Sequence, residues 1–321
     1  MIKPKKWLRR SVWIISIAFV LMNVVACFHA YKFTHFSDSA IPKTENPEKL
    51  SFAAKLKALF LGISNPRPQN KQQPSGSFET VMLQSNKRIE GWFIPADSAK
   101  GTVVICHGFS GYKSSMLDKA EVFHTQGYNT FLIDFMGSGG SEGNQTTVGY
   151  DEAQQVCTAY RYVKHKTQQP VILFGTSMGA AAIMKAVCDS SLQAQALILE
   201  CPFGTMLETV EARFHNMHVP AFPMARLLVF WGGFQNGFNA FAHNPAEYAA
   251  GISIPVLLMY GEKDVSVSRA ETDRIFAGFK GLKTLRLYQD AGHENYLKKY
   301  RDVWTEDVDL FLTKLPPVAQ Q

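Results

Sequence analysis

Hydrophobic residues are spaced in two different patterns along most of this chain. Short apolar runs predict buried strands, and segments with apolar residues three or four positions apart predict helices between them. The predicted strands are Glu79–Leu83, Arg88–Ile94, Thr102–Cys106, Thr130–Asp134, Val171–Phe174, Ala196–Glu200, Pro255–Tyr260 and Thr284–Tyr288. The predicted helices are Met116–Gln126, Tyr150–Lys166 and Gly179–Cys188, and helical patterns follow the last two strands. This alternation predicts an α/β fold with a mostly parallel central sheet, joined by right-handed crossovers and covered by helices on both faces.

Residues 203–250 break the alternation, because the segment lies between two strands and is too long for a crossover alone. We expect it to form an inserted helical cap. Its aromatic residues include Phe203, Phe214, Phe222, Phe230, Trp231, Phe234, Phe238 and Phe241. These rings either line an apolar substrate pocket or form the core of the cap itself, and the two interpretations are compatible.

The N-terminal segment has a third pattern. Five basic residues and no acid occupy the first ten positions: Lys3, Lys5, Lys6, Arg9 and Arg10. No charged residue then interrupts the stretch from Ser11 to Tyr31, which just reaches the roughly 20 residues that a spanning helix needs. The basic flank predicts that the N-terminus stays in the cytoplasm and that the rest of the chain lies outside the membrane.

Two alternatives to an uncleaved anchor stay open for this segment. Val24–Cys27 resembles a bacterial lipobox, in which the cysteine is lipidated after cleavage, although leucine is the usual first residue there. A basic region followed by an apolar one also describes a cleaved secretion signal. Because the apolar run continues beyond Cys27 to Tyr31, the pattern favours the spanning helix.

These patterns predict three parts. Residues 1–31 form the basic stub and transmembrane anchor, 32–77 a proline-punctuated connector, and 78–316 the α/β domain with the cap at 203–250. Within the connector we expect a short helix docked on the domain, with a membrane-surface or substrate-guiding helix as the alternative. Its apolar positions are Phe52, Leu56, Leu59 and Phe60.

Composition agrees with a folded protein of 321 residues, 46% of them hydrophobic and 19% charged. The net charge of +6 is concentrated in the first ten positions, so the remainder of the chain is nearly neutral. A nucleic-acid partner is not expected, since it would need a basic face on the folded domain. No two of the five cysteines stand at C-x-x-C spacing, so a zinc or thioredoxin-like site is not expected either.

The first candidate for chemistry is the G-x-S-x-G sequence Gly175–Gly179, between an apolar strand and an alanine-rich helix. A strand-to-helix turn this tight requires glycine on both sides of the nucleophile, and it presents the Ser177 hydroxyl at the carboxyl edge of the sheet. The helix N-terminus also supplies the backbone N–H of Met178 for a developing oxyanion.

A serine hydroxyl needs a base and an acid that orients the base. Asp264 follows one predicted strand and His293 the next, where the carboxyl ends of parallel strands converge. Glu262 and Glu200 are the alternative acids. Upstream, Gly108 allows a close approach of the loop after a core strand, so that the N–H of Phe109 can face the oxyanion opposite Met178. We expect the neighbouring His107 to hold this loop by a hydrogen bond.

Taken together, five segments resemble the α/β-hydrolase superfamily, and within it the serine aminopeptidase and monoacylglycerol-lipase-like group. The segments are His107-Gly108-Phe109, Asp134–Ser141, Gly175–Gly179, Gly261–Asp264 and Gly292-His293, in the family's order. The resemblance implies a Ser177–His293–Asp264 triad, an oxyanion hole from the Phe109 and Met178 amides, and hydrolysis of an ester, thioester or amide through an acyl-enzyme. Met136 departs from the arginine common at this position, which puts local ion pairing and specificity in question.

We therefore expect a serine hydrolase that cleaves a carboxylic ester, with a small-molecule or lipid-like acyl substrate and membrane attachment through the N-terminal segment. No cofactor or metal is expected, because His215 and His218 have no carboxylate at ligand spacing. A serine aminopeptidase-type peptidase or amidase is the first alternative, for which Glu208 and Glu211 could bind a free amine. A catalytically silent binding protein on the same fold is the second.

Overall fold

The computed structural model describes residues 6–38, 41–42, 44 and 62–316. The helix predicted around Phe52–Phe60 lies outside the described residues, as do Lys3 and Lys5 of the basic stub.

A single eight-stranded sheet forms the centre of the molecule, with the strand order β1-β2-β4-β3-β5-β6-β7-β8. β1 pairs antiparallel with β2, and β2 antiparallel with β4, whereas every later pair is parallel. The strands are β1 Glu79–Gln84, β2 Arg88–Ile94, β3 Thr102–Cys106, β4 Asn129–Ile133, β5 Val171–Thr176, β6 Ala196–Glu200, β7 Val256–Gly261 and β8 Lys283–Tyr288. The alternation predicts this mostly parallel sheet, with strand ends shifted by no more than two residues, and the α/β-hydrolase fold is the one that the resemblance implies.

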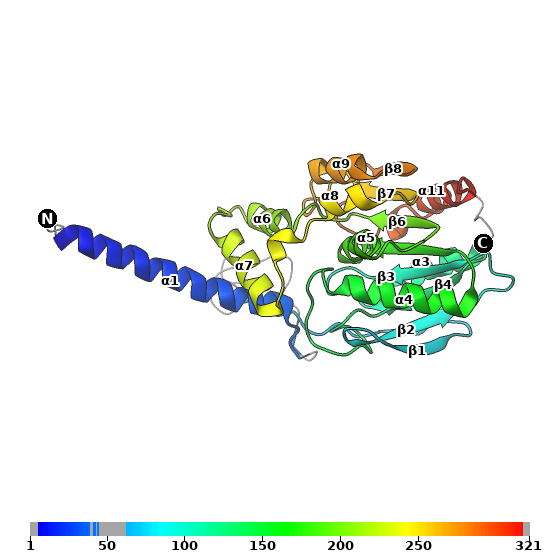
Figure 1. Ribbon diagram of the computed structural model, residues 1–321, viewed down its shortest axis with the longest axis horizontal. Helices are drawn as coiled ribbons and strands as arrows, with labels where there is room; N and C mark the ends of the chain where they lie inside the picture. Colours follow the sequence, from blue (N-terminus) through cyan, green and yellow to red (C-terminus); the bar gives the residue numbers. More distant parts are fainter. Residues whose placement is uncertain (1–5, 39–40, 43, 45–61, 317–321) are drawn as a thin grey trace.

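Helices cover both faces of the sheet (Figure 1). They are α3 Leu117–Thr125, α4 Glu152–Thr167, α5 Met178–Ser190, α8 Pro245–Tyr248, α9 Arg269–Gly278, α10 Tyr296–Lys299 and α11 Arg301–Thr313. Successive residues of β3 point to opposite faces, as a pleated strand requires. Val104 packs with α4 and α5 in one hydrophobic cluster, and Ile105 packs with α3 and α11 in the other.

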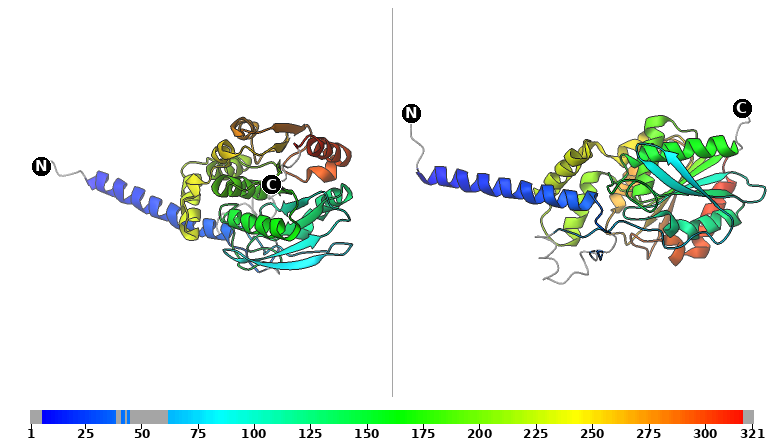
Figure 2. Two further views of the ribbon diagram at one scale, coloured as in Figure 1. Left: turned by 45° about the vertical axis from the view of Figure 1, so that its right-hand side comes forward. Right: turned by 90° about the horizontal axis from the view of Figure 1, so that it is seen from below.

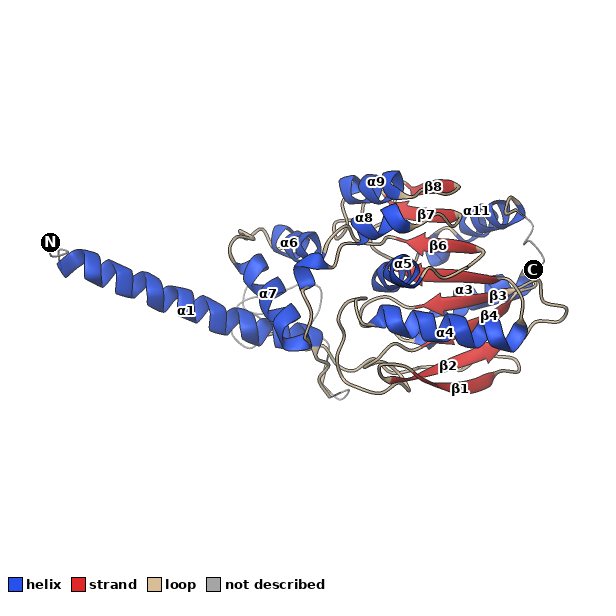
Figure 3. Cartoon of the chain, viewed as in Figure 1, coloured by secondary structure: helices blue, strands red, loops and turns tan. Residues whose placement is uncertain are grey.

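The segment between β6 and β7 adds α6 Met206–Asn216 and α7 Met224–Asn236, which stand off from the sheet on the side where β3 and β6 end (Figure 3). Phe203 is buried and Phe238 stacks on Tyr150 of the body. Four other rings of this segment are exposed: Phe222, Phe230, Phe234 and Phe241. Because these four rings are exposed, they do not form a core of the cap.

That N-terminal helix, α1, runs without interruption from Lys6 to Thr34 and projects away from the body (Figure 2). It contains the uncharged stretch from Ser11 to Tyr31. It is the one helix among the described residues that is long and apolar enough to cross a membrane. The side chain of Asn23 donates to the carbonyl of Phe19 at 2.9 Å, which satisfies part of this polar group within the helix.

The chain enters the body directly after α1. The carbonyl of Thr34 accepts from Thr146 N–H at 2.8 Å, and Phe36 N–H donates to the carbonyl of Asn144 at 2.6 Å. Ser37 and Arg67 extend these contacts, because Arg67 N–H donates to the Ser37 carbonyl at 2.9 Å. The described residues at the start of the predicted connector are therefore fastened to the body.

Candidate active site

Ser177 lies in the turn between β5 and α5 with a φ of 53°, a left-handed conformation that non-glycine residues rarely adopt. A Cβ at Gly175 would lie 2.6 Å from the carbonyl carbon of Gly179, and one at Gly179 would lie 2.5 Å from the carbonyl oxygen of Cys106. Both distances are too short for real contacts. The two glycines are therefore required sterically, and the turn holds Ser177 at the carboxyl edge of the sheet.

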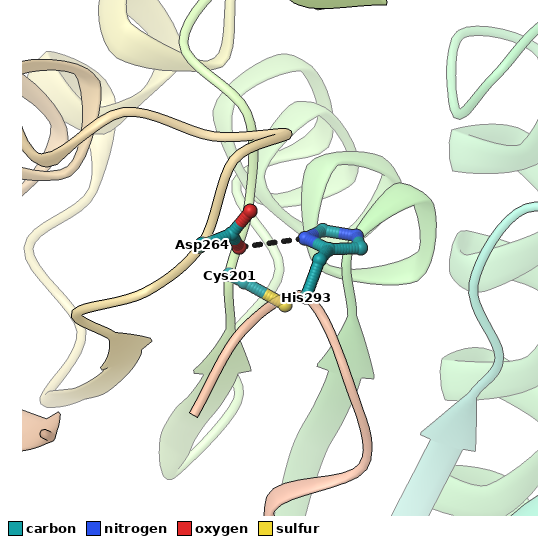
Figure 4. A group of neighbouring side chains, drawn as sticks. All are labelled: Cys201, Asp264 and His293. Carbon is teal, nitrogen blue, oxygen red and sulfur yellow. Dashed lines mark hydrogen bonds and ion pairs between the residues drawn. The ribbon is translucent and has the colours of Figure 1, made fainter. Parts of the chain in front are cut away.

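The structure brings the three predicted side chains into one hydrogen-bonded row. The hydroxyl of Ser177 donates to Nε2 of His293 over 2.9 Å, and Nδ1 of His293 lies 2.7 Å from Oδ2 of Asp264 (Figure 4). The second carboxylate oxygen, Oδ1, accepts from the backbone N–H groups of Ser266 at 2.7 Å and Val267 at 2.9 Å. Asp264 is thus fixed from both sides, and it in turn fixes the plane of the imidazole.

Both alternative acids are engaged elsewhere. Glu200 is fully buried and accepts hydrogen bonds from Trp304 Nε1 at 2.7 Å and from the hydroxyl of Thr176 at 2.8 Å. Glu262 pairs at the surface with Arg269 at 3.5 Å. Of the three carboxylates that the sequence leaves open, Asp264 is the one that contacts His293.

The surroundings of His293 raise the pKa of its imidazole. Burial disfavours its charged form, but the neighbouring Cys201 and the carboxylate of Asp264 outweigh this and raise the pKa of His293 well above 6.5. Its side chain is nevertheless 30% exposed. A buried carboxylate beside a partly exposed imidazole is the arrangement that stabilises an imidazolium after proton transfer.

The loop after β3 lies against the nucleophile. A Cβ at Gly108 would come within 3.3 Å of the Thr176 carbonyl and 3.6 Å of the Ser177 Cβ, so the backbone passes close to the serine. His107 holds this loop as predicted: its Nδ1 donates to the Gly108 carbonyl at 2.8 Å, and its Nε2 accepts from the N–H of Phe135 at 3.1 Å. Burial lowers the pKa of His107, which suits a neutral ring that donates and accepts.

Phe33 and Arg213 also belong to this region, although neither lies in a motif that indicates a site in the sequence. The ring of Phe33, in the last turn of α1, stacks on the ring of Phe109. The guanidinium of Arg213, on α6, lies 4.0 Å above the Phe33 ring and 5.6 Å from the Phe109 ring. Within the described part of the chain, no acid lies at ion-pair distance from Arg213. Burial lowers the pKa of Arg213 to about 10, so it stays positively charged near neutral pH.

The loop with Met136 has a different source of positive charge from the family's arginine. Lys113 is fully buried, and its ammonium binds the carboxylate of Asp134 and, at 2.6 Å, that of Glu90. Arg67, from the segment before β1, donates to the carbonyls of Gly139, Ser141 and Gly143. Met136 itself is buried. Local ion pairing is therefore retained by residues distant in sequence from Met136.

One group could be mistaken for a metal site. Donor atoms of Cys201, Asp264 and His293 lie within 4.8 Å of one another (Figure 4). Two ligands of a tetrahedral zinc ion with bonds of about 2.05 Å would be about 3.4 Å apart. The distance of 2.7 Å between His293 Nδ1 and Asp264 Oδ2 is that of a hydrogen bond instead. His215 and His218 are exposed on the cap.

Comparison with known proteins agrees with this fold. The sequence model of the family described as serine aminopeptidase, S33, matches residues 97–250, which include Ser177 but neither Asp264 nor His293. The chain is 25% identical to the uncharacterized protein YqkD of Bacillus subtilis (strain 168), over 71% of this chain and 76% of that protein. It is 27% identical to the lysophosphatidylserine lipase ABHD12 of Danio rerio, over 60% of this chain and 50% of that one.

Solved structures share the architecture. The esterase Pf2001 of Pyrococcus furiosus superimposes with a TM-score of 0.66 at 22% identity, over 78% of this chain and 97% of its own. An esterase of Exiguobacterium antarcticum superimposes with a TM-score of 0.55 at 18% identity, over 74% of this chain and its full length.

Proposed function

We propose that this α/β hydrolase is a serine hydrolase that cleaves carboxylic esters of lipid-derived acyl chains, with Ser177, His293 and Asp264 as its catalytic triad. The observation that carries the proposal is the row of hydrogen bonds from the Ser177 hydroxyl through the His293 imidazole to the Asp264 carboxylate.

In the proposed reaction, Ser177 Oγ attacks the ester carbonyl while His293 Nε2 takes the hydroxyl proton. The N–H groups of Phe109 and Met178 stabilise the oxyanion of the tetrahedral intermediate. His293 then returns the proton to the leaving alcohol, and the acyl group stays on Ser177. Water, deprotonated by His293, attacks this acyl-enzyme and releases the carboxylic acid. Asp264 stays ionised and stabilises the imidazolium in both half-reactions.

Charge near the site supports an ester over a peptide substrate. An aminopeptidase needs an acid for the free amine of its substrate, but Glu208 already binds both its oxygens to Arg274 at 2.6 Å. The cation of Arg213 beside Phe109, which has no acid at ion-pair distance among the described residues, would repel an ammonium group. The two esterase structures and the lysophosphatidylserine lipase among the relatives point the same way. The serine aminopeptidase description of the family keeps peptidase activity as the second candidate.

We further propose that α1 is an uncleaved membrane anchor and that the rest of the chain lies outside the cytoplasm. Lys6, Arg9 and Arg10 begin the helix on the side expected to be cytoplasmic. Helix α1 is continuous through Cys27, and α7 packs against α1 residues on both sides of a cleavage point before Cys27. Lipidation at Cys27 is the alternative. Recovery of an N-terminal peptide spanning Ala26 and Cys27 by mass spectrometry would support the anchor, and its replacement by a lipidated Cys27 would contradict it.

A fluorophosphonate probe tests the chemistry. Folded wild-type protein should be labelled, and Ser177→Ala should not be. Absence of labelling in the folded wild type would support a catalytically silent protein, and labelling that persists in Ser177→Ala would identify a different nucleophile. A panel of acyl esters of rising chain length, assayed beside aminoacyl amides, then separates the two candidate activities, because faster cleavage of the amides would favour the peptidase.

A further inference from the structure

From the arrangement of α1 and α7 we infer that the cap forms a second membrane contact: the α6–α7 turn and the outer face of α7 dock onto the outer surface of the lipid bilayer beside α1. The inference rests on the proposed anchoring of α1. It adds a lipid-binding surface that is distant from α1 in the sequence, since Trp231 and its partner Asn23 are 208 residues apart.

The first observation is the packing of α7 along the C-terminal part of α1, seen in all views (Figures 1 and 2). Hydrogen bonds from two side chains of α7, Trp231 and Gln235, join the helices. Trp231 Nε1 donates to Asn23 Oδ1 at 3.1 Å, and Gln235 Nε2 donates to the Cys27 carbonyl at 2.8 Å. Asn23 and Cys27 both lie inside the stretch expected to span the membrane. Interhelical hydrogen bonds of this kind join helices in lipid, where polar side chains have no water to bind.

The second observation is a set of large apolar side chains exposed on the cap. In the α6–α7 turn, Phe222 is 76% exposed; on α7, Phe230 is 48% and Phe234 is 69% exposed. Phe230 and Phe234 are four residues apart, so they share one face of the helix, and both rings contact the indole of Trp231. We call Phe222, Phe230, Trp231 and Phe234 the cap aromatic cluster. Trp231 is half-buried against α1, which makes the cluster continuous with the apolar surface of α1.

The third observation is charge. No Asp or Glu occurs between Glu211 and Glu247, and the charged residues there are Arg213 and Arg226. Arg226 is the only charged residue of α7, and it is exposed. An apolar helix face with aromatic residues, a basic residue and no acid fits the boundary between lipid headgroups and acyl chains, where arginine can reach a phosphate.

The bilayer explains these features together, because the occupant of the cap face must also surround α1. Figure 3 shows that β3 and β6 end toward the side from which α1 projects, so the candidate triad lies on the membrane side of the sheet. A cap seated on the bilayer places the site at the lipid surface, and an ester lipid could move from the outer leaflet to Ser177 without crossing bulk water.

Lipid photolabelling of the full-length protein tests the contact. The protein is reconstituted into vesicles of phosphatidylcholine and phosphatidylglycerol that contain a trace lipid with a diazirine in its acyl chain, and labelled peptides are mapped by mass spectrometry. We expect label on α1 and on the peptides of the cap aromatic cluster, and none around Leu282, which is 65% exposed on the body. Label on α1 with an unlabelled cap would overturn the inference, as would cross-links between the caps of two copies in place of lipid. An unlabelled α1 would overturn the proposed anchoring and the inference with it.

A matched pair of variants tests the consequence for activity. Phe234→Asp and Leu282→Asp each place a carboxylate at an exposed apolar position, one on the cap and one on the body. Burying a phenylalanine side chain contributes enough free energy that Phe234→Asp should lower hydrolysis of a long-chain ester held in vesicles about tenfold or more. Hydrolysis of a short, water-soluble ester and fluorophosphonate labelling should stay within about twofold of wild type. Leu282→Asp should leave both activities unchanged. Equal rates of hydrolysis of the vesicle substrate by the two variants would overturn the inference. Failure of the wild-type protein to hydrolyse the soluble ester would instead count against the proposed function.

Discussion

The ring of Phe33 stacks on the ring of Phe109 with centroids 4.6 Å apart and planes within 5° of parallel. Phe33 lies in the last turn of the N-terminal helix, and Phe109 carries one of the two proposed oxyanion N–H groups. The proposed oxyanion loop of the candidate active site is therefore in direct contact with the proposed membrane anchor.

Removing this stack should slow the reaction. An aromatic pair contributes about 0.5–1.5 kcal/mol beyond its buried area, so Phe33→Ala should lower kcat for a soluble ester by about two- to tenfold, with a smaller effect on KM. Phe19→Ala is the control, because Phe19 is an exposed ring on the same helix away from the site. Equal kcat values for the two variants would show that the stack does not position Phe109.

Activity should rise with pH. His293 must be neutral to accept the Ser177 proton, and its pKa is raised above 6.5, so kcat/KM should fall as the pH drops through a midpoint above 6.5. Asp264→Asn removes the carboxylate, and it should lower kcat by about 10⁴-fold and move this midpoint to lower pH. A pH profile of each variant measures both effects. An unchanged midpoint in Asp264→Asn would assign the perturbation of His293 to another group.

The same raised pKa affects stability in the opposite direction. The folded state binds the His293 proton more tightly than the unfolded state does, so this contribution is fully present below a pH of about 6.5 and is lost as the pH rises through the folded value. Thermal unfolding of wild type and His293→Gln across this range should therefore converge at high pH. A difference that grows with pH would contradict the raised value.

The strained backbone at Ser177 predicts a stability difference between two inactive variants. Ser177→Gly relieves the left-handed conformation, whereas Ser177→Ala keeps a Cβ in it. We expect the free energy of unfolding of Ser177→Gly to exceed that of Ser177→Ala by about 1 kcal/mol. Ser177→Gly should therefore unfold at a higher denaturant concentration. Chemical denaturation measures the difference. Equal stabilities would mean that the turn stores no appreciable strain.

Arg213 should select substrates by charge. No described acid pairs with this cation beside the proposed oxyanion loop, so Arg213→Gln should reduce kcat/KM for soluble esters carrying a carboxylate or phosphate, relative to neutral esters, by about three- to tenfold. Arg226→Gln is the control, because Arg226 is exposed on α7. A uniform loss on charged and neutral esters would assign Arg213 a purely structural role in holding Phe33 and Phe109.

Local patterns predicted the sheet, and they singled out the three side chains that the structure joins by hydrogen bonds. The strand-to-helix turn at Ser177 has a steric requirement for two glycines that is visible in five residues, and the proximity of Ser177, Asp264 and His293 follows from parallel strands that end at one edge. The pattern also predicted that His107 holds its loop, because a polar residue directly after a buried strand needs a partner.

Contacts between distant parts of the chain were not predictable from these patterns. Phe33 reads as one more apolar residue at the end of a hydrophobic helix, and nothing near it in sequence indicates Phe109. Arg213 is one arginine in a helix whose partners depend on where α6 lies. The rings of the cap looked like core or pocket residues because hydrophobic spacing predicts burial, and it cannot tell whether the burying surface is protein or lipid.

The hydrogen bonds that join Thr34 and Phe36 to the loop at 144–146 have a consequence for how such an enzyme would meet its substrates. A catalytic domain on a flexible linker takes many orientations above the membrane and can reach soluble molecules or a facing bilayer. Here the proposed anchor is hydrogen-bonded to the domain directly after its last turn. The helix therefore sets the tilt of the domain and the height of Ser177 above the membrane. Encounters would then occur by diffusion in two dimensions, and their rate would follow the surface density of the lipid in the enzyme's own leaflet.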